Sequence, residues 1–214
     1  IYTTGFADRN YDKGRFAPYV IEDGHTIPSR LDDEMQRKVI AVAESAIRAL
    51  GIDSGPAKGD LTVTPSGRVV VFEMACRTSG GRFCSDMVPL ATGVSILKPL
   101  IQMAVGDPVD TADLAPRFQR AAAQRFFWPR PGTVTGITSW HASDGEGVHD
   151  IVIGLAVGDT VRQPKCHADR AGYVIASAKT RQEAIVRAER AVAEVKIETA
   201  EVNQGRIDSQ ISTV

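Results

Sequence analysis

The sequence predicts an α+β fold, in which an antiparallel sheet carries packed helices and is followed by a smaller β-rich lobe. Three observations lead to this class: a long amphipathic helix, a β-hairpin directly after it, and short β-rich runs separated by Gly and Pro beyond residue 120. We place one lobe at residues 1–110, a second at 111–200, and a mobile tail at 201–214.

The clearest helix runs from Leu31 to Leu50, after a predicted strand at Phe16 to Ile21. Its apolar residues recur at steps of three and four, so they form one stripe on a helix of period 3.6. Ser29 is the predicted N-cap, and Gly51 fits the position just after the C-terminus.

The hairpin is predicted from two β-rich runs, Asp60 to Thr64 and Arg68 to Met74, joined by turn residues. A further helix spans Gly93 to Val105, with a kink or a late start at Pro99. A capping box beginning at Thr180 marks the last helix. The remaining predicted strands are 121–128, 133–140, 148–157, 172–178 and 196–199.

Composition excludes several classes of protein. The net charge is −1, so the chain has no basic field that would hold a nucleic acid or a membrane surface. It has no apolar run near the roughly 20 residues of a membrane span. Its three cysteines lack metal-type spacing and are predicted to be reduced thiols of a cytoplasmic protein.

Two carboxylates of the hairpin are the most informative residues. If the turn holds four residues, Thr64 pairs with Val69 and Asp60 lies directly opposite Glu73. Glu73 ends an apolar run, so its neighbours are expected to be buried. The repulsion between facing carboxylates is relieved by protonation, by a nearby Arg or by a divalent cation. Carboxylates with phosphates as co-ligands are typical of a magnesium site. The alternative is Asp60 in solvent and Glu73 paired with Arg77.

A loop with anion-binding chemistry follows the hairpin. Arg77 lies four residues beyond Glu73 and leads into Ser79, Gly80 and Gly81. A fixed guanidinium beside backbone N–H groups can bind a phosphate or a carboxylate. Taken alone, Gly80-Gly81 is also compatible with a flexible turn. The order of carboxylates, Arg and Gly-rich loop favours a site.

The pattern Glu73-x-x-x-Arg77-x-x-Gly80-Gly81 resembles the signature that ends the ATP-binding hairpin of the ATP-grasp superfamily. Pro28-Ser29 before the long helix, Thr92-Gly93 before the next helix, and the stretch 169–184 agree with this resemblance, which reaches to about Thr199. It resembles the L-amino-acid ligases and carbamoyl-phosphate-synthetase-like proteins most.

The resemblance implies an ATP-dependent carboxylate–amine ligase that works through an acyl phosphate. Asp60 and Glu73 would bind ATP and hold the Mg²⁺, or Mn²⁺ in its place, that bridges its phosphates. Arg77 would bind the substrate carboxylate, with Ser79, Gly80 and Gly81 beside it. In amino-acid ligases of this family a His before the Pro-Ser step faces the substrate, and His25 matches that position loosely. On its own, His25 is expected to be a surface loop residue.

Two departures from the family pattern affect these expectations. Ala75 stands where the signature has Asn, which marks a subfamily and argues against a biotin-carboxylase-like carboxylase. The half of the family that folds over ATP should precede Ile1, in this or another chain, so the chain alone should be incomplete. The partners implied are a small carboxylate, an amine, that missing half and a possible second copy. A non-catalytic binding module is the alternative from another class.

Overall fold

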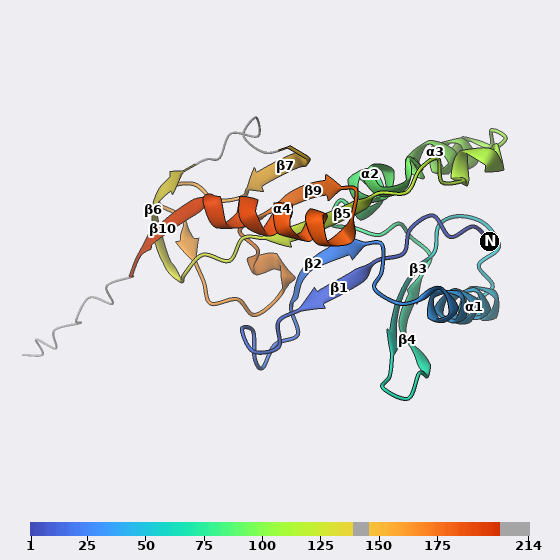
Figure 1. Ribbon diagram of the computed structural model, residues 1–214, viewed down its shortest axis with the longest axis horizontal. Helices are drawn as coiled ribbons and strands as arrows, with labels where there is room; N and C mark the ends of the chain where they lie inside the picture. Colours follow the sequence, from blue (N-terminus) through green and yellow to red (C-terminus); the bar gives the residue numbers. More distant parts are fainter. Residues whose placement is uncertain (139–145, 202–214) are drawn as a thin grey trace, which may run out of the picture.

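The computed structural model describes residues 1–138 and 146–201 and shows three antiparallel sheets with four α-helices in those residues. The main sheet has five strands in the order β1-β2-β5-β9-β7 (Figure 1). These strands are β1 (Asp8–Tyr11), β2 (Glu22–Ile27), β5 (Ala121–Phe126), β9 (Gly172–Ala178) and β7 (Val148–Ile153). The α+β class predicted from the sequence is confirmed.

The two faces of the main sheet have separate cores. Helix α4 (Arg181–Glu194) covers one face and packs its alanines on β5 and β9. The other face is covered by the π-helical turn η1 (Phe83–Met87) and helix α2 (Val88–Thr92), whose Met87 and Val88 pack on Ala122 and Ile175. Side chains alternate along each strand, so consecutive residues of β5 face different cores.

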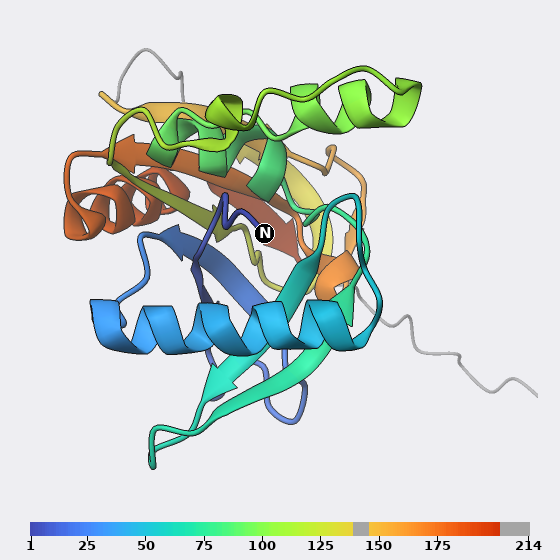
Figure 2. The same ribbon diagram turned by 90° about the vertical axis from the view of Figure 1, so that its right-hand side faces the viewer.

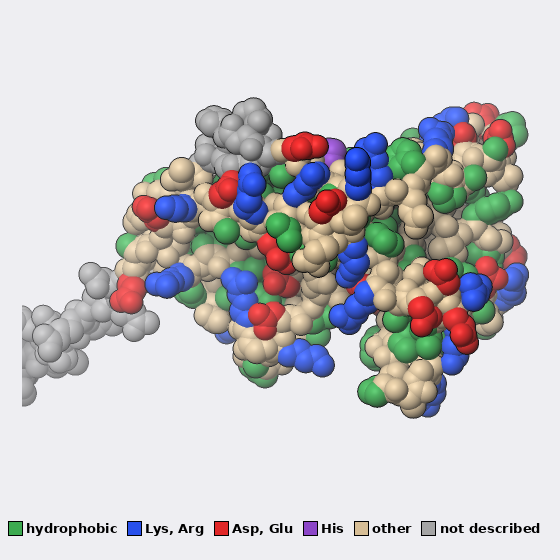
Figure 3. Space-filling view, in the orientation of Figure 1, with side chains coloured by type: hydrophobic (Ala, Val, Ile, Leu, Met, Phe, Trp, Pro, Cys, Tyr) green, Lys and Arg blue, Asp and Glu red, His purple; other side chains and the backbone are tan. Residues whose placement is uncertain are grey.

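Helix α1 (Asp33–Ala49) and the hairpin form a separate layer beside the sheet (Figure 2). The hairpin consists of β3 (Lys58–Val63) and β4 (Val69–Ala75), and α1 lies across it. Lys38 of α1 donates a hydrogen bond to the carbonyl of Gly67 in the turn, at 2.7 Å. In the space-filling view a notch separates the free end of the hairpin from the main sheet (Figure 3).

Two predictions near the N-terminus are wrong. The N-cap of α1 is Asp32, whose side chain accepts from the backbone N–H of Met35, because Ser29 instead donates to Asp8 Oδ1 at 2.5 Å. The strand predicted at 16–21 begins only at Glu22. Phe16 precedes it in a turn, where its ring packs against Trp128 with the two centroids 4.7 Å apart.

Most other predicted elements are confirmed within a few residues. Gly51 has the left-handed φ of 67° expected after α1, and the capping box of Thr180 and Glu183 begins α4. The helix predicted at 93–105 starts late, as α3 (Leu97–Val105), because Gly93 takes a left-handed φ and ends α2. Short 3₁₀ turns occupy Thr111–Leu114 (η2) and His167–Asp169 (η4).

A three-stranded sheet in the order β10-β6-β8 lies beside the main sheet. Its strands are β6 (Gly132–Thr138), β8 (Thr160–Val161) and β10 (Lys196–Ala200). The lobe boundary near residue 110 stays a prediction, although β2 pairs with β5 across it. The predicted tail falls outside the described residues from 202 on. Within the described part of the chain, no helix is both long and apolar enough to cross a bilayer.

Candidate functional site

The hairpin brings Asp60 and Glu73 face to face, as predicted, but by a different register. Val63, and not Thr64, pairs with Val69, so the predicted pairing at the turn is wrong by one residue. A β-bulge at Phe72 then shifts the register back, because Leu61 pairs with Val71 while Asp60 pairs with Glu73. The bulge therefore restores the facing carboxylates.

Three basic side chains neutralise this carboxylate pair. Arg9 of β1 reaches Asp60 Oδ2 at 3.0 Å, and Lys58 contacts the same oxygen in a short ion pair. Lys58 Nζ also lies 3.4 Å from Glu73 Oε1, and Arg77 Nη2 lies 3.3 Å from that oxygen. The alternative pairing of Glu73 with Arg77 is thus present, whereas Asp60 is not a free carboxylate in solvent.

The hairpin is much more exposed than the sequence predicts. The side chain of Glu73 is 50% exposed and Phe72 is 75% exposed, so the expectation of buried neighbours is wrong. The reason is that α1 covers the hairpin from one side only, and the bulged Phe72 projects away from that contact. Glu73 therefore remains accessible to a ligand, whereas the Asp60 side chain is only 19% exposed.

The carboxylate pair fits a magnesium ion held jointly by protein and phosphates. Mg²⁺ is commonly bound through one or two carboxylates, with phosphates and waters completing its octahedral shell. Asp60 and Glu73 supply two such donors on one face of the hairpin. Ala75 has no side-chain oxygen that could bind a metal ion. Within the described residues, no group of three or more His, Cys, Asp or Glu side chains could hold a metal without other ligands.

His25 lies in β2 and is 7% exposed, so the expectation of a surface loop is wrong. Its Nε2 is 2.8 Å from Glu22 Oε1, and its Nδ1 is 3.2 Å from Gln124 Oε1. A Cβ added to Gly81 would lie 3.8 Å from the imidazole, so the predicted loop passes directly over His25. The contact between His25 and a substrate stays a prediction.

The loop after the hairpin is held by its own groups. Arg77 Nη1 donates to the carbonyl of Thr78 at 3.0 Å, and its side chain is 52% exposed. Gly81 has a left-handed φ of 62°, and Arg82 follows at 64°, a conformation that residues with a Cβ seldom adopt. Backbone of this kind is concentrated at functional sites. Arg77 and Ser79–Gly81 therefore remain the predicted anion site, next to His25.

A buried polar cluster under this loop was not predicted from the sequence. Glu22 is its centre: Arg9 Nε lies 3.1 Å from one carboxylate oxygen, and Arg170 donates to the Glu22 backbone carbonyl at 2.8 Å. Burial alone would raise the pKa of Glu22, but His25, Arg9 and Arg170 together lower it below its ordinary value of 4.5. Arg9 links this cluster to Asp60, so the main sheet and the hairpin share one charge network.

Gln124 completes the cluster with an unsatisfied amide. It is fully buried, and its Nε2 has no hydrogen-bond partner among the described residues. The tight contact of β2 and β5 depends on Gly24, because a Cβ there would lie 2.1 Å from the carbonyl oxygen of Gln124. A polar residue inside the apolar run 121–128 was the one available sequence signal for this position.

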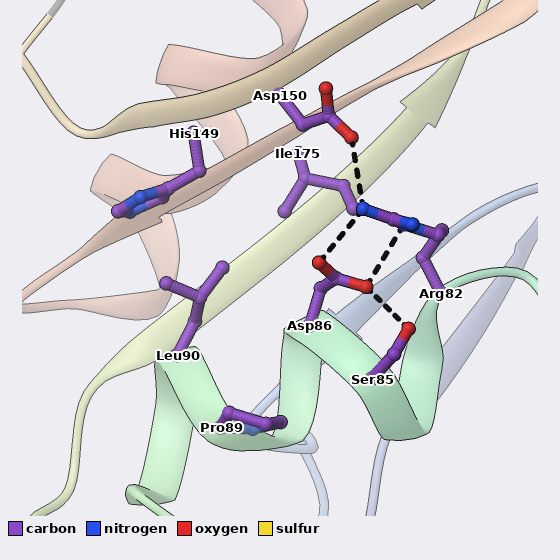
Figure 4. A pocket seen from close by; sticks show the side chains of 8 residues that line it. All are labelled: Arg82, Ser85, Asp86, Pro89, Leu90, His149, Asp150 and Ile175. Atoms are coloured by element: carbon purple, nitrogen blue, oxygen red, sulfur yellow. Dashed lines mark hydrogen bonds and ion pairs between the residues drawn. The ribbon is translucent and has the colours of Figure 1, made fainter.

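A hollow lies on the face of the main sheet that η1 and α2 cover, between these two elements and strands β7 and β9 (Figure 4). Arg82 points into it, with Nε 2.9 Å from Asp86 and Nη2 3.4 Å from Asp150. Tyr173 donates to Asp150 at 3.0 Å, and burial together with that carboxylate raises the pKa of Tyr173. The charge of Arg82 is matched by two carboxylates. The candidate site stays at the hairpin and its loop, where the carboxylate pair lies next to Arg77.

Comparisons with known proteins relate this chain to amino acid ligases. Residues 125–200 match the family model of the L-amino acid ligase C-terminal domain 2. The chain is 30% identical over 177 residues to the uncharacterized protein y4rH of Sinorhizobium fredii, covering 82% of this chain and 36% of that protein. It is 32% identical over 109 residues to the D-alanine–D-alanine ligase of Geotalea uraniireducens, covering 51% of this chain and 30% of that protein. The chain thus spans about a third of these relatives.

Solved structures share the fold at low sequence identity. A phosphoribosylglycinamide synthetase from Anaerococcus prevotii has a TM-score of 0.78 at 16% identity, covering 94% of this chain and 51% of that one. An L-amino acid ligase from Bacillus licheniformis has a TM-score of 0.73 at 19% identity, covering 84% of this chain and 44% of that chain. A biotin carboxylase domain from Hydrogenobacter thermophilus, solved with MgADP and bicarbonate, has a TM-score of 0.60 at 18% identity. It covers 83% of this chain and 39% of that chain.

Proposed function

We propose that this chain, which belongs to the ATP-grasp superfamily, is the magnesium- and substrate-binding half of an ATP-dependent carboxylate–amine ligase. The observation that carries the proposal is the facing pair Asp60 and Glu73, with Arg77 four residues beyond and the Gly-rich loop beside it. The match to an L-amino acid ligase domain supports an amino acid as one of the two substrates.

The reaction has two balanced steps. A carboxylate oxygen of the first substrate attacks the γ-phosphorus of ATP, which gives an acyl phosphate and ADP. The amine then attacks the acyl carbon, the bond to phosphate breaks, and the amide, inorganic phosphate and a proton are released. Bound magnesium would neutralise the phosphate oxygens during the first step. Neither step needs a covalent enzyme nucleophile, so we assign no such role to Cys76 or Cys84.

The residues of this chain bind and orient the reactants. Asp60 and Glu73 would hold the magnesium ion against the nucleotide phosphates. Arg77, whose guanidinium is half exposed, would hold the acceptor carboxylate in line for attack. The backbone of Ser79–Gly81 would border that carboxylate, with His25 beneath it. Most of the rate enhancement would then come from positioning and from stabilising charge.

The rest of the site would come from outside this chain. The curated relatives are about three times as long as the part that this chain covers. We propose that the additional part supplies the lobe that closes over ATP, and that both substrates bind between that lobe and the hairpin. The exposed side chains of Phe72 and Glu73 in the hairpin would face that lobe.

The proposal is tested by calorimetric titration of magnesium–ATP into two proteins: this chain, and the protein extended to the length of its relatives. Each is measured with the native sequence, with Glu73→Gln and with Glu44→Gln as a control. Among the described residues, Glu44 is paired only with Arg48 of the same helix, α1. We expect binding in the extended protein, its loss on Glu73→Gln and no change on Glu44→Gln. Absence of binding in both lengths would reject the ligase and favour a non-catalytic module.

A further inference from the structure

Lys58 occupies an unusual place between the two carboxylates of the hairpin. Its ammonium pairs with Asp60 Oδ2 and lies 3.4 Å from Glu73 Oε1, so one cation bridges both acids. The side chain is only 10% exposed, whereas Glu73 is half exposed. Lysine is seldom buried unless its charge is paired. The bridge therefore explains why this Lys lies in the hairpin and does not extend into solvent.

The same two oxygens are those that a bridging metal ion would need. Asp60 already has two basic partners within 3.0 Å, Arg9 and Lys58, and Glu73 has two within 3.4 Å, Lys58 and Arg77. A carboxylate pair with this many cations is electrostatically neutralised, so it offers little attraction to a free divalent cation. A metal ion entering the pair would also be repelled by the ammonium of Lys58.

Nucleotide phosphates change this balance. Their negative charges would compensate both the metal ion and the ammonium, and the flexible four-carbon stem of Lys58 allows the ammonium to turn from the carboxylates toward a phosphate oxygen. Arg9 has no such freedom, because its guanidinium is also bound to buried Glu22 at 3.1 Å. Of the two cations bound to Asp60, Lys58 is therefore the one that is free to move.

We propose that Lys58 is an internal counter-ion that excludes free divalent cations from Asp60 and Glu73, so that the metal enters only together with a nucleotide. The inference rests on the proposed function, because it takes these two carboxylates as the metal ligands. It makes Lys58 a positioning residue that sets the order of binding.

The test is titration of Mn²⁺ into the 214-residue chain without nucleotide, followed by the electron paramagnetic resonance signal of the free ion. The variants are Lys58→Met, Lys58→Arg and, as the matched control, Lys38→Met. Lys38 contacts the turn of the same hairpin through Gly67 and neither carboxylate. We expect Lys58→Met to bind Mn²⁺ at least about tenfold more tightly than the native chain. Lys58→Arg and Lys38→Met should bind as weakly as the native chain.

A double variant locates the gained site. Lys58→Met with Asp60→Asn should lose the gain if the metal binds at the carboxylate pair. The proposal is overturned if Lys58→Met keeps the native circular dichroism spectrum and binds Mn²⁺ no more tightly than the native chain. That result leaves the ligase proposal intact, since the latter depends on nucleotide binding in the extended protein. Conversely, a gain of Mn²⁺ affinity without any nucleotide binding in the extended protein would reject the ligase and the joint entry of metal and nucleotide, and would leave only the exclusion of free cations by Lys58.

Discussion

The two faces of the main sheet differ in chemistry although they come from the same strands. On one face, Ala123 and Ala176 are fully buried against Ala184 and Ala188 of α4. On the other face, Gln124 is equally buried but has an unsatisfied amide. The α4 face is closely packed because small side chains let the helix approach the strands. The opposite face holds charges and orphaned polar atoms that a dry core would not contain.

We propose that the face covered by η1 and α2, which lies next to the candidate site, is the functional half of the sheet. Glu22, His25 and Arg9 all belong to the charged face, and Arg9 connects that face to Asp60 of the hairpin. The α4 face also has a buried polar residue, Arg125, which contacts Glu189 of α4 at 3.2 Å and the hydroxyl of Thr26 at 3.3 Å. Substitutions on the α4 face should therefore affect folding, whereas substitutions on the charged face should affect folding and ligand binding together.

The largest effect is expected from a charge placed on the α4 face. Ala188→Asp should destabilise the chain by about 4 kcal/mol or more, because the new carboxylate would be buried without a partner. Val186→Asp is the matched control, since Val186 lies on the same helix and is 51% exposed. It should change the free energy of unfolding by less than about 0.5 kcal/mol. Urea denaturation measures both, and equal losses would show that the α4 face is not a packed core.

The next largest effect is expected at the centre of the charged face. Glu22→Gln should cost about 3 kcal/mol, because it removes the carboxylate that balances Arg9, His25 and Arg170 in a buried site. Glu198→Gln, on the partly exposed strand β10, should cost less than about 0.5 kcal/mol. A loss at Glu22 no larger than at Glu198 would show that the cluster does not hold the strands together.

The pH dependence of stability gives Glu22 a second signature. Its pKa is lowered in the folded state, so its contribution is fully present above the ordinary value of 4.5 and is lost as pH falls through the folded pKa. The native chain should therefore lose stability below pH 4.5 more steeply than Glu22→Gln does. Thermal unfolding at a series of pH values from acid to neutral measures the two slopes. Parallel stability curves for the native chain and Glu22→Gln would contradict the lowered pKa of Glu22.

The sequence predicted the hairpin site better than it predicted the charged face. Asp60, Glu73 and Arg77 lie within one short stretch, so local alternation and turn chemistry were enough to bring them together. Even there the agreement depended on a bulge that no pattern indicated: the predicted turn register was wrong by one residue, and Phe72 compensated for it. The exposure of the hairpin was also missed, because an apolar run does not show which of its sides is covered.

The charged face could not be predicted because its members are distant in sequence. Arg9, Gln124 and Arg170 become neighbours only when β1, β5 and the segment before β9 join β2 in one sheet. The pairing order of those strands depends on packing over the whole chain, which one sequence does not reveal. Helix caps show the same limit on a smaller scale. Thr180 was identified by its capping box, but Ser29 was bound instead by Asp8 from another strand.

The ion pair between Arg9 of the main sheet and Asp60 of the hairpin should contribute less to stability than Glu22 does. Arg9→Met and Asp60→Asn in a double-mutant cycle should give an interaction energy of about 0.5 kcal/mol, because the pair is partly exposed to solvent. Salt should weaken this energy. The free energy of unfolding of the four proteins, at low and at high salt, provides the measurement. A coupling of zero would mean that the sheet and the hairpin are held together by packing alone.

The smallest effect is expected at Phe72, which is 75% exposed on the bulge. Phe72→Ser should change the free energy of unfolding of this chain by less than about 0.5 kcal/mol, since the ring contributes little to the packing against α1. Phe127→Ala is the matched control, because Phe127 is 3% exposed in the core under α4 and should lose about 3 kcal/mol or more. In the extended protein, Phe72→Ser should become destabilising if the additional lobe covers the hairpin. Equal stability of the native and substituted extended proteins would place that lobe elsewhere.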